Sequence, residues 1–202
     1  MTHRSLFASG LFALALALPV AASAQRGGPI EVPEVPFNLT IPEGNVPFLQ
    51  TRAYGTQNYV CTPAASGGVA WKLFGPQATL YPTSAPIQVA THFLSANPEE
   101  DNLPRPTWQD SHDGSIVWGR AIQSSLDSNY VAPGAVAWLK LEKAGTFDGV
   151  IGQGLLSDTT FIQRVNTQGG VAPATGCTTA AQLGSTVLVP YSTDYFFYRK
   201  EQ

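Results

Sequence analysis

The sequence predicts an all-β protein, either an antiparallel β-sandwich or a flattened β-barrel with long loops. Three observations favour this class. Short runs of alternating apolar and polar residues recur along the chain, and no segment after the apolar N-terminal residues has the period of an ordinary helix. Gly (19 residues) and Pro (16 residues) are abundant, as is typical of chains with many turns. Charged residues make up only 12 % of the chain, against about 25 % in an average protein.

The first residues have the features of a secretory signal peptide. Arg4 supplies a positive charge, residues 6–20 are almost wholly apolar, and Ala22-Ser23-Ala24 is a small-x-small cleavage motif. We interpret residues 1–24 as a signal peptide that is cleaved after Ala24. The apolar run is too short for a membrane span. The mature chain is therefore expected to be exported, to the periplasm or the extracellular space, without a transmembrane segment.

Residues 25–45 are rich in Pro and Gly, which disfavours a helix or a central strand. We interpret them as an extended N-terminal arm that leads into a single all-β domain over residues 46–202. The formal net charge of the chain is −3, and its basic residues form no stripe. A nucleic acid is therefore not expected as a partner.

Glycine and proline divide the domain into ten to eleven expected strands. Gly55 is expected to turn the chain between the first two strands, and Gly75-Pro76 to end the third. Pro82 and Pro86 are expected to separate the fourth strand from the fifth. The expected strands are residues 48–54, 57–61, 69–74, 78–81, 87–93, 107–109, 115–122, 135–141, 160–167, 183–190 and 194–199.

Three features place the strands of the second half. Residues 94–106 are polar and contain three prolines, so they are expected to form a loop. Asp113-Gly114 is a strong hairpin signal between the strands that flank it. In residues 135–141, Leu139 and Leu141 share one face and Trp138 lies on the other, because successive side chains of a strand point to opposite faces.

Cys61 and Cys177 are the two cysteines of the chain. In an oxidising compartment an isolated pair most simply forms one disulfide. Their spacing matches no Cys-x-x-Cys motif, so a redox or metal-binding pair is the weaker interpretation.

Motifs spread along the chain resemble those of one uncharacterised family. They are Gly55-x-Gln57-x-Tyr59-x-Cys61, Thr91-His92-Phe93, Pro106-Thr107-Trp108-Gln109, Asp113-Gly114-Ser115, Ala137-Trp138-Leu139, Ile162 to Thr167, Gly169-Gly170, Cys177 and Val189 to Ser192 with Asp194-Tyr195. Their order over residues 41–198 is similar to that in the domain-of-unknown-function family 3455 of secreted bacterial and fungal proteins. The resemblance implies no activity. The chain departs from the family pattern at residues 94–105, which separate His92 from Trp108.

Aromatic and polar residues predict a ligand-binding cleft. Tryptophans can line a cleft or stack on a sugar, although the favoured interpretation is that they are core and rim residues of the sheets. Arg164 is expected to point inward with Ile162, and a buried arginine requires a partner such as Asp113, Asp194 or a bound anion. The candidate ligand-binding residues are His92, Trp108, Asp113, Trp138, Arg164 and Asn166.

His92, His112 and Asp113 form the candidate metal or catalytic group. Two histidines and a carboxylate could hold a transition metal, and Ser115 beside Asp113 could serve as a nucleophile with His92 as its base. No cofactor is otherwise evident. Both interpretations compete with a structural one, in which Asp113-Gly114-Ser115 is simply a tight turn. Carboxylates that could cleave a glycosidic bond are Glu99, Asp101, Asp110 and Asp113.

These observations lead to three hypotheses for function. The favoured one is an exported, non-catalytic protein that binds a small molecule or a glycan, or is associated with the cell envelope. The second is a metal-dependent or hydrolytic enzyme centred on His92, His112 and Asp113. The third is a structural or interaction protein without a pocket.

Overall fold

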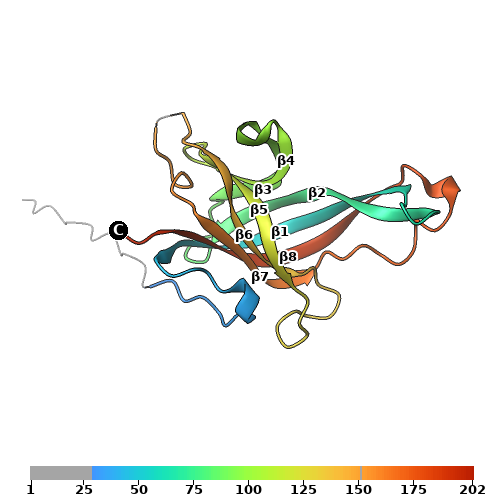
Figure 1. The fold of residues 1–202 in the computed structure, drawn as a ribbon, viewed down its shortest axis with the longest axis horizontal. Coiled ribbons are helices and arrows are strands. Elements are labelled where there is room, and N and C mark those ends of the chain that lie inside the picture. The colour runs from blue at the N-terminus through green and yellow to red at the C-terminus, as the bar shows by residue number, and fades with distance from the viewer. Residues whose placement is uncertain (1–28, 151) are drawn as a thin grey trace, which may run out of the picture.

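The computed structural model describes residues 29–150 and 152–202, which form a closed antiparallel barrel. Each of its eight strands pairs with the next one in the chain, and β8 pairs with β1 (Figure 1). The strands are β1 (Asn45–Pro63), β2 (Val69–Pro82), β3 (Ala90–Asn97), β4 (Leu103–Asp110), β5 (Ile116–Ser125), β6 (Trp138–Phe147), β7 (Phe161–Gly169) and β8 (Thr186–Lys200). The all-β prediction is confirmed, and the architecture is a barrel.

Three short 3-10 helices lie in the described part of the chain, one in the N-terminal arm and two in connections between strands. They are η1 (Phe37–Leu39), η2 (Pro98–Glu100) and η3 (Ala180–Gln182). None of the helices in the described part of the chain is long and apolar enough to cross a membrane. The predicted signal peptide, residues 1–24, lies outside the described residues.

Three of the expected strand breaks are wrong, because two expected strands run on as one in β1, in β2 and in β8. Gly55 lies inside β1, where a side chain would overlap the backbone of Gln77 and Ala78 in β2. This glycine is therefore required by close strand packing, and not by a turn. Pro76 and Pro190 lie where β2 and β8 pair with β1 but not with β3 or β7, so the missing proline N–H breaks no ladder.

The loop expected at residues 94–106 is instead the end of a hairpin. β3 and β4 pair through Asn97 and Leu103, and η2 closes the turn. Arg105 donates to the Glu100 carboxylate from Nε and Nη2, both at 2.7 Å. These hydrogen bonds lower the pKa of Glu100 to about 2. The hairpin expected at Asp113-Gly114 is confirmed, because it joins the antiparallel pair β4 and β5.

The inside of the barrel holds one hydrophobic core. Alternate residues of the strands point inward, so Leu141 of β6, Ile162 of β7 and Phe197 of β8 meet there, and each is at most 1 % exposed. The predicted faces of residues 135–141 are correct, since Leu139 and Leu141 pack in this core and Trp138 does not.

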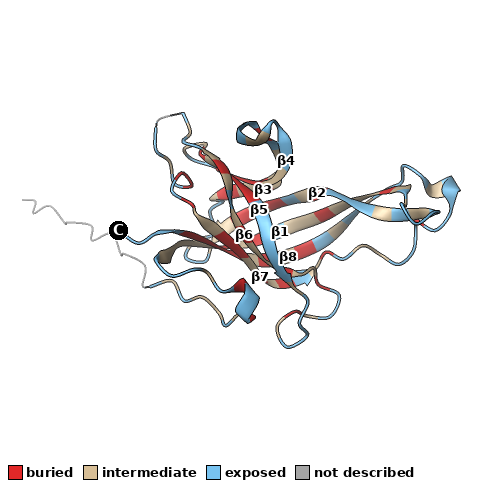
Figure 2. Cartoon of the chain, viewed as in Figure 1, coloured by how far each residue is buried: buried red, intermediate tan, exposed pale blue. Residues whose placement is uncertain are grey.

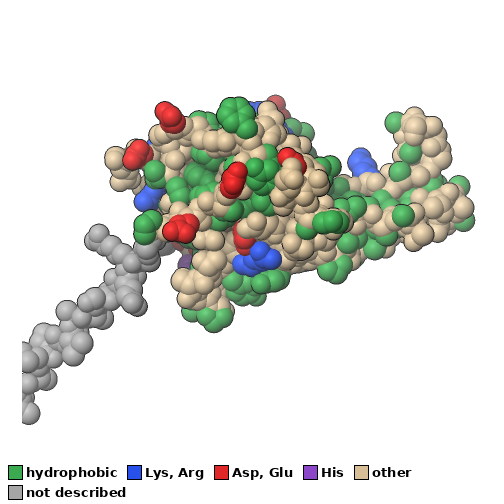
Figure 3. All heavy atoms as spheres, turned by 90° about the horizontal axis from the view of Figure 1, so that it is seen from below, with side chains coloured by type: hydrophobic (Ala, Val, Ile, Leu, Met, Phe, Trp, Pro, Cys, Tyr) green, Lys and Arg blue, Asp and Glu red, His purple; other side chains and the backbone are tan. Residues whose placement is uncertain are grey.

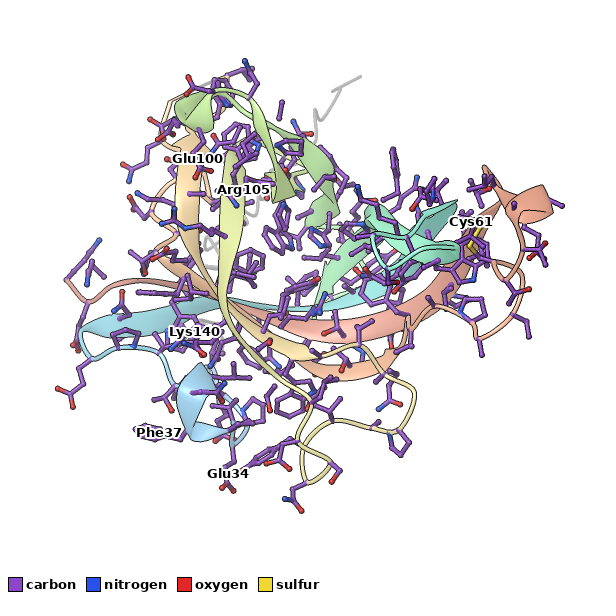
Figure 4. The ribbon with its side chains drawn as sticks, turned by 45° about the vertical axis from the view of Figure 1, so that its right-hand side comes forward. Glu34, Phe37, Cys61, Glu100, Arg105 and Lys140 are labelled. Atoms are coloured by element: carbon purple, nitrogen blue, oxygen red, sulfur yellow. A yellow bond between two sulfur atoms is a disulfide. The ribbon has the colours of Figure 1, made fainter. Side chains whose placement is uncertain are left out.

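A second core lies outside the barrel, where the N-terminal arm covers β6, β7 and β8 (Figures 2 and 4). Leu39 of η1 is fully buried among Trp138, Val165 and Phe196. Gln163 of β7 connects the arm to β8. Its Nε2 donates to Leu39 O at 2.7 Å, and its Oε1 accepts from Tyr198 Oη. Here an outward-facing polar side chain is buried together with its partners.

β1, β2 and β8 extend beyond the barrel as a three-stranded projection, which we call the ribbon (residues 58–63, 69–76 and 186–190). It forms the right-hand end of the molecule in Figure 1. Cys61 and Cys177 form a disulfide near its tip, with their Cα atoms 5.5 Å apart (Figure 4). Hydrophobic side chains lie along its surface (Figure 3), among them Phe74, which is 70 % exposed.

Candidate functional site

A cavity of about 180 Å³ occupies the end of the barrel interior at the base of the ribbon. We call it the lumen cavity. Its inner wall is buried and its outer residues are half-buried or exposed, so it reaches from the core to the surface. The lining residues are Gln57, Tyr59, Leu73, Pro76, His92, Pro106, Trp108, Val136, Leu139, Leu141, Arg164 and Tyr195.

Aromatic rings form the inner wall of the lumen cavity. His92 of β3 and Trp108 of β4 are cross-strand partners, and their rings stack with centroids 4.2 Å apart and an interplanar angle of 11°. Tyr195 of β8 meets both rings edge-on, at 5.3 Å from each centroid. This arrangement fixes the orientation of all three side chains.

His92 is held in one neutral form. Its Nδ1 lies 2.8 Å from Thr107 O, and because a carbonyl oxygen only accepts, Nδ1 must carry the proton. Complete burial, reinforced by the positive charge of Arg164, lowers the pKa of His92 to about 3 despite this hydrogen bond. The imidazole is therefore neutral at physiological pH, and its Nε2 is an acceptor.

This burial predicts a pH-dependent stability. The unfolded chain takes up a proton on His92 near pH 6.5, whereas the folded protein resists protonation down to about pH 3. The contribution of His92 is therefore fully present above pH 6.5 and is lost as the pH falls toward 3, by up to about 1.4 kcal/mol per pH unit. Denaturant unfolding between pH 7 and pH 4 measures this slope, which we expect to be shallower in His92→Gln.

His112→Gln is the matched control, because His112 is exposed and its replacement should leave the wild-type slope unchanged. If the free energy of unfolding changes with pH equally in the wild-type protein and in His92→Gln, the burial of a neutral imidazole is contradicted.

Arg164 of β7 brings a positive charge to the lumen cavity. Its Nε and Nη2 both donate to the backbone oxygen of Ala137, at 3.2 and 2.8 Å. Within the described residues, no carboxylate oxygen lies within 4.0 Å of its guanidinium. The two carboxylates considered from the sequence are engaged elsewhere, since Asp194 binds Arg52 at 2.9 Å and Asp113 binds backbone amides.

Buried polar atoms around the cavity lack partners. In the described part of the chain, Trp108 Nε1 has no hydrogen-bond partner. Gln57 Nε2, Tyr191 Oη and Tyr195 Oη lie near one another and near Arg164, but they make no hydrogen bond of regular geometry. Burial raises the pKa of both Tyr191 and Tyr195, so their hydroxyls stay protonated and can donate at neutral pH. Each such atom is costly to bury alone.

Asp113 and His112 lie apart from the lumen cavity, at an open concavity beside the β4–β5 hairpin. Asp113 Oδ1 accepts from Ser115 N at 2.7 Å, and its Oδ2 accepts from Leu155 N at 2.7 Å. Burial alone would raise the pKa of Asp113, but hydrogen bonds from Ser115 and Leu155 leave it below its ordinary value. This carboxylate thus anchors the loop that precedes β7.

The candidate catalytic serine is also part of that anchor. Ser115 is fully buried, and its Oγ accepts from Leu156 N at 3.1 Å. His92 lines the lumen cavity, whereas His112 and Asp113 line the open concavity. Among residues 29–150 and 152–202, no three His, Cys, Asp or Glu side chains group as a metal site would require.

The other candidate residues take separate places. Trp138 packs in the outer core under the arm. Asn166 lies in a bulge of β7 with a φ of 52°, and its Nδ2 donates to Asp194 Oδ2 at 2.8 Å. Glu99 Oε1 accepts from Thr146 N at 2.8 Å. Asp110 Oδ1 accepts from the amides of His112 and Asp113, at 2.8 and 2.9 Å.

The structure therefore brings His92, Trp108 and Arg164 together in one wall. Sequence reasoning missed Gln57, Tyr59 and Tyr195, which complete the polar part of that wall. The inward alternation of β8 could have indicated Tyr195, since Tyr191, Tyr195 and Phe197 share one face of that strand.

These features define a class, the eight-stranded up-and-down β-barrel with a cavity in its lumen. Within that class, the chain belongs to the family described as protein of unknown function (DUF3455), whose model matches residues 42–199. The resemblance found in the sequence is thereby confirmed. No curated protein and no solved structure matches the chain.

Proposed function

We propose that this protein binds one small molecule with a largely apolar body in the lumen cavity. The observation that carries the proposal is the composition of the wall, in which apolar side chains surround buried polar atoms without partners. Eight-stranded barrels are just wide enough to be filled by side chains or to hold one small ligand. A ligand that supplies hydrogen-bond partners would remove the cost of burying those atoms.

The size of the cavity limits the ligand. A volume of about 180 Å³ is close to that of an engineered apolar cavity of about 150 Å³ that binds benzene. A molecule with a single ring is of this size, whereas an oligosaccharide would need a longer, open groove. The stacked rings of His92 and Trp108 offer a planar group an edge or a face.

The chemistry of the wall favours binding over catalysis. A general base works best when its pKa lies near the working pH, whereas the pKa of His92 is about 3. The neutral imidazole can instead accept a hydrogen bond from a ligand through Nε2. The enzyme hypothesis needs its residues in one place, but His92 lines the lumen cavity whereas His112 and Asp113 line the open concavity.

Binding of single-ring compounds tests the proposal. We would titrate the protein with phenol, benzamide and benzoate and follow the indole N–H resonance of Trp108 by NMR. Val136 lines the cavity and is half-buried, so Val136→Phe should fill its outer part and weaken binding at least tenfold. Leu139→Phe repeats the test at a second half-buried lining position, which lies in β6.

Val171→Phe is the matched control, because Val171 is 47 % exposed and does not line the cavity. It should bind as the wild-type protein does, and near-ultraviolet circular dichroism reports whether each variant keeps its fold. The proposal fails if no compound shifts the Trp108 resonance at millimolar concentration, or if folded Val136→Phe and Leu139→Phe bind like the control.

We further propose that the protein works outside the cytoplasm. The signal peptide predicted at residues 1–24 and the Cys61–Cys177 disulfide support export, since disulfides persist in oxidising compartments. The mass of the protein recovered from the native cell tests this proposal. The mass should be that of a chain that begins at Gln25. A full-length chain retained in the cytoplasm would refute the proposal.

A further inference from the structure

We propose that the ligand of the lumen cavity is an anion, and that its carboxylate binds the free edge of the Arg164 guanidinium. This inference rests on the proposed function and adds the charge class of the ligand. It follows from the geometry of Arg164, the absence of a protein counter-ion among the described residues, and the donors around the guanidinium.

One edge of the guanidinium is occupied and the other is free. Nε and Nη2 both donate to one acceptor, Ala137 O. Nη1 makes no hydrogen bond of regular geometry within the described residues, and the protein group that lies close to the guanidinium is the Tyr195 hydroxyl. The Nη1–Nη2 edge therefore keeps a pair of parallel N–H groups. This pair matches the two oxygens of a carboxylate, which arginine binds in a bidentate manner.

The protein supplies no neutralising charge to this edge. Four ion-pair contacts among the described residues join Arg52, Arg105 and Arg120 to Asp194, Glu100 and Glu142. Arg164 is in none of them, although it lines a cavity with apolar walls. Arg164 is half-buried, and the burial of a charge costs free energy that an opposite charge can offset. An anionic ligand would provide the missing partner.

Neighbouring groups would assist the anion. Tyr195 and Tyr191 lie near each other and near Arg164. Burial raises the pKa of both hydroxyls, and the positive charge of Arg164 partly offsets that rise. Their hydroxyls and Gln57 Nε2 are donors without regular partners in the described residues. The lone pair on His92 Nε2 would repel an anion, so the carboxylate is placed on the Arg164 side of the cavity. The apolar body then lies against Leu139 and Leu141.

Benzoate and benzamide test the charge, because they have the same ring and nearly the same shape but differ in charge. At pH 7 we expect calorimetry or NMR titration to give at least tenfold tighter binding of benzoate to the wild-type protein. Arg164→Gln should remove this preference, so that the variant binds benzoate no more tightly than benzamide, because the charge that distinguishes the two ligands is gone. Arg164→Lys should restore part of the preference.

Arg199→Gln is the matched control for the loss of one positive charge. Arg199 is exposed and lies outside the cavity lining, so this variant should keep the full preference for benzoate. Equal or tighter binding of benzamide, with the Trp108 resonance still shifted, would overturn the anion inference while leaving the proposed function intact. Failure of every single-ring compound to bind would overturn both.

The groups around the cavity also fix the expected pH dependence. Those that face Arg164 are His92 of β3, Tyr59 of β1, and Tyr191 and Tyr195 of β8. Burial moves the pKa of each of them away from neutrality. Benzoate affinity should therefore be constant between pH 6 and 8, and a steep change in this range would contradict the assignment of the anion to Arg164.

Discussion

Replacing Leu39 by alanine should lower the free energy of unfolding by about 2–5 kcal/mol, the range for a fully buried leucine. Leu39 is 0 % exposed although it belongs to the N-terminal arm and lies outside the barrel. Its side chain fills the outer core, so the truncation leaves a cavity between η1 and the strands beneath it. Denaturant unfolding at pH 7 measures the change.

Phe37→Ala is the control, because Phe37 lies two residues away in the same 3-10 helix and is 94 % exposed. This variant should change stability by less than about 0.5 kcal/mol. Similar small effects in both variants would show that the arm does not stabilise the barrel. The pair of variants thus separates burial from any general effect of changing η1.

The second large effect is expected from the disulfide. Cys61→Ser with Cys177→Ser should lower the free energy of unfolding by about 2–4 kcal/mol, because the bridge closes a long loop in the unfolded chain. The two cysteines are 116 residues apart. The bridge lies near the ribbon tip, and neither cysteine lines the lumen cavity, so the double variant should bind single-ring compounds as the wild-type protein does.

Reduction of the wild-type protein is the independent check on that value. The reduced protein and the double variant should unfold at the same denaturant concentration. A difference of less than about 0.5 kcal/mol between the oxidised and reduced proteins would mean that the bridge does not restrict the unfolded chain.

The sequence pattern predicts where strands lie better than where they end. Alternation places β5 and β7 within a few residues, but residues 103–106, the first half of β4, have the composition of a loop. The errors fall at Gly55 and Gly75-Pro76, because glycine and proline mark turns in most chains but here occur within strands. Gly55 is required by contact with β2, and Pro76 lies on an edge that no third strand pairs with. Both reasons are tertiary, and local sequence does not contain them.

The candidate site was predictable in part for the same reason. Period-two alternation places Arg164 on the face of Ile162, and its need for a partner follows from burial. The convergence of Arg164 with His92 and Trp108 depends on closure of the barrel, which brings β3, β4 and β7 around one lumen. Trp138 shows the limit of this reasoning, since the arm that buries it on the outside carries no strand or helix pattern that would place it there.

Pairing of β1 with β8 has a consequence for how the protein folds. It joins Asn45 to Lys200 across almost the whole domain, which gives the barrel a high contact order, and such topologies fold slowly because distant segments must meet before their contacts form. Until β8 arrives, β1 and β7 each present an unpaired edge that another chain can extend. A chain shortened before Thr186 would keep both edges unpaired, and we expect it to aggregate.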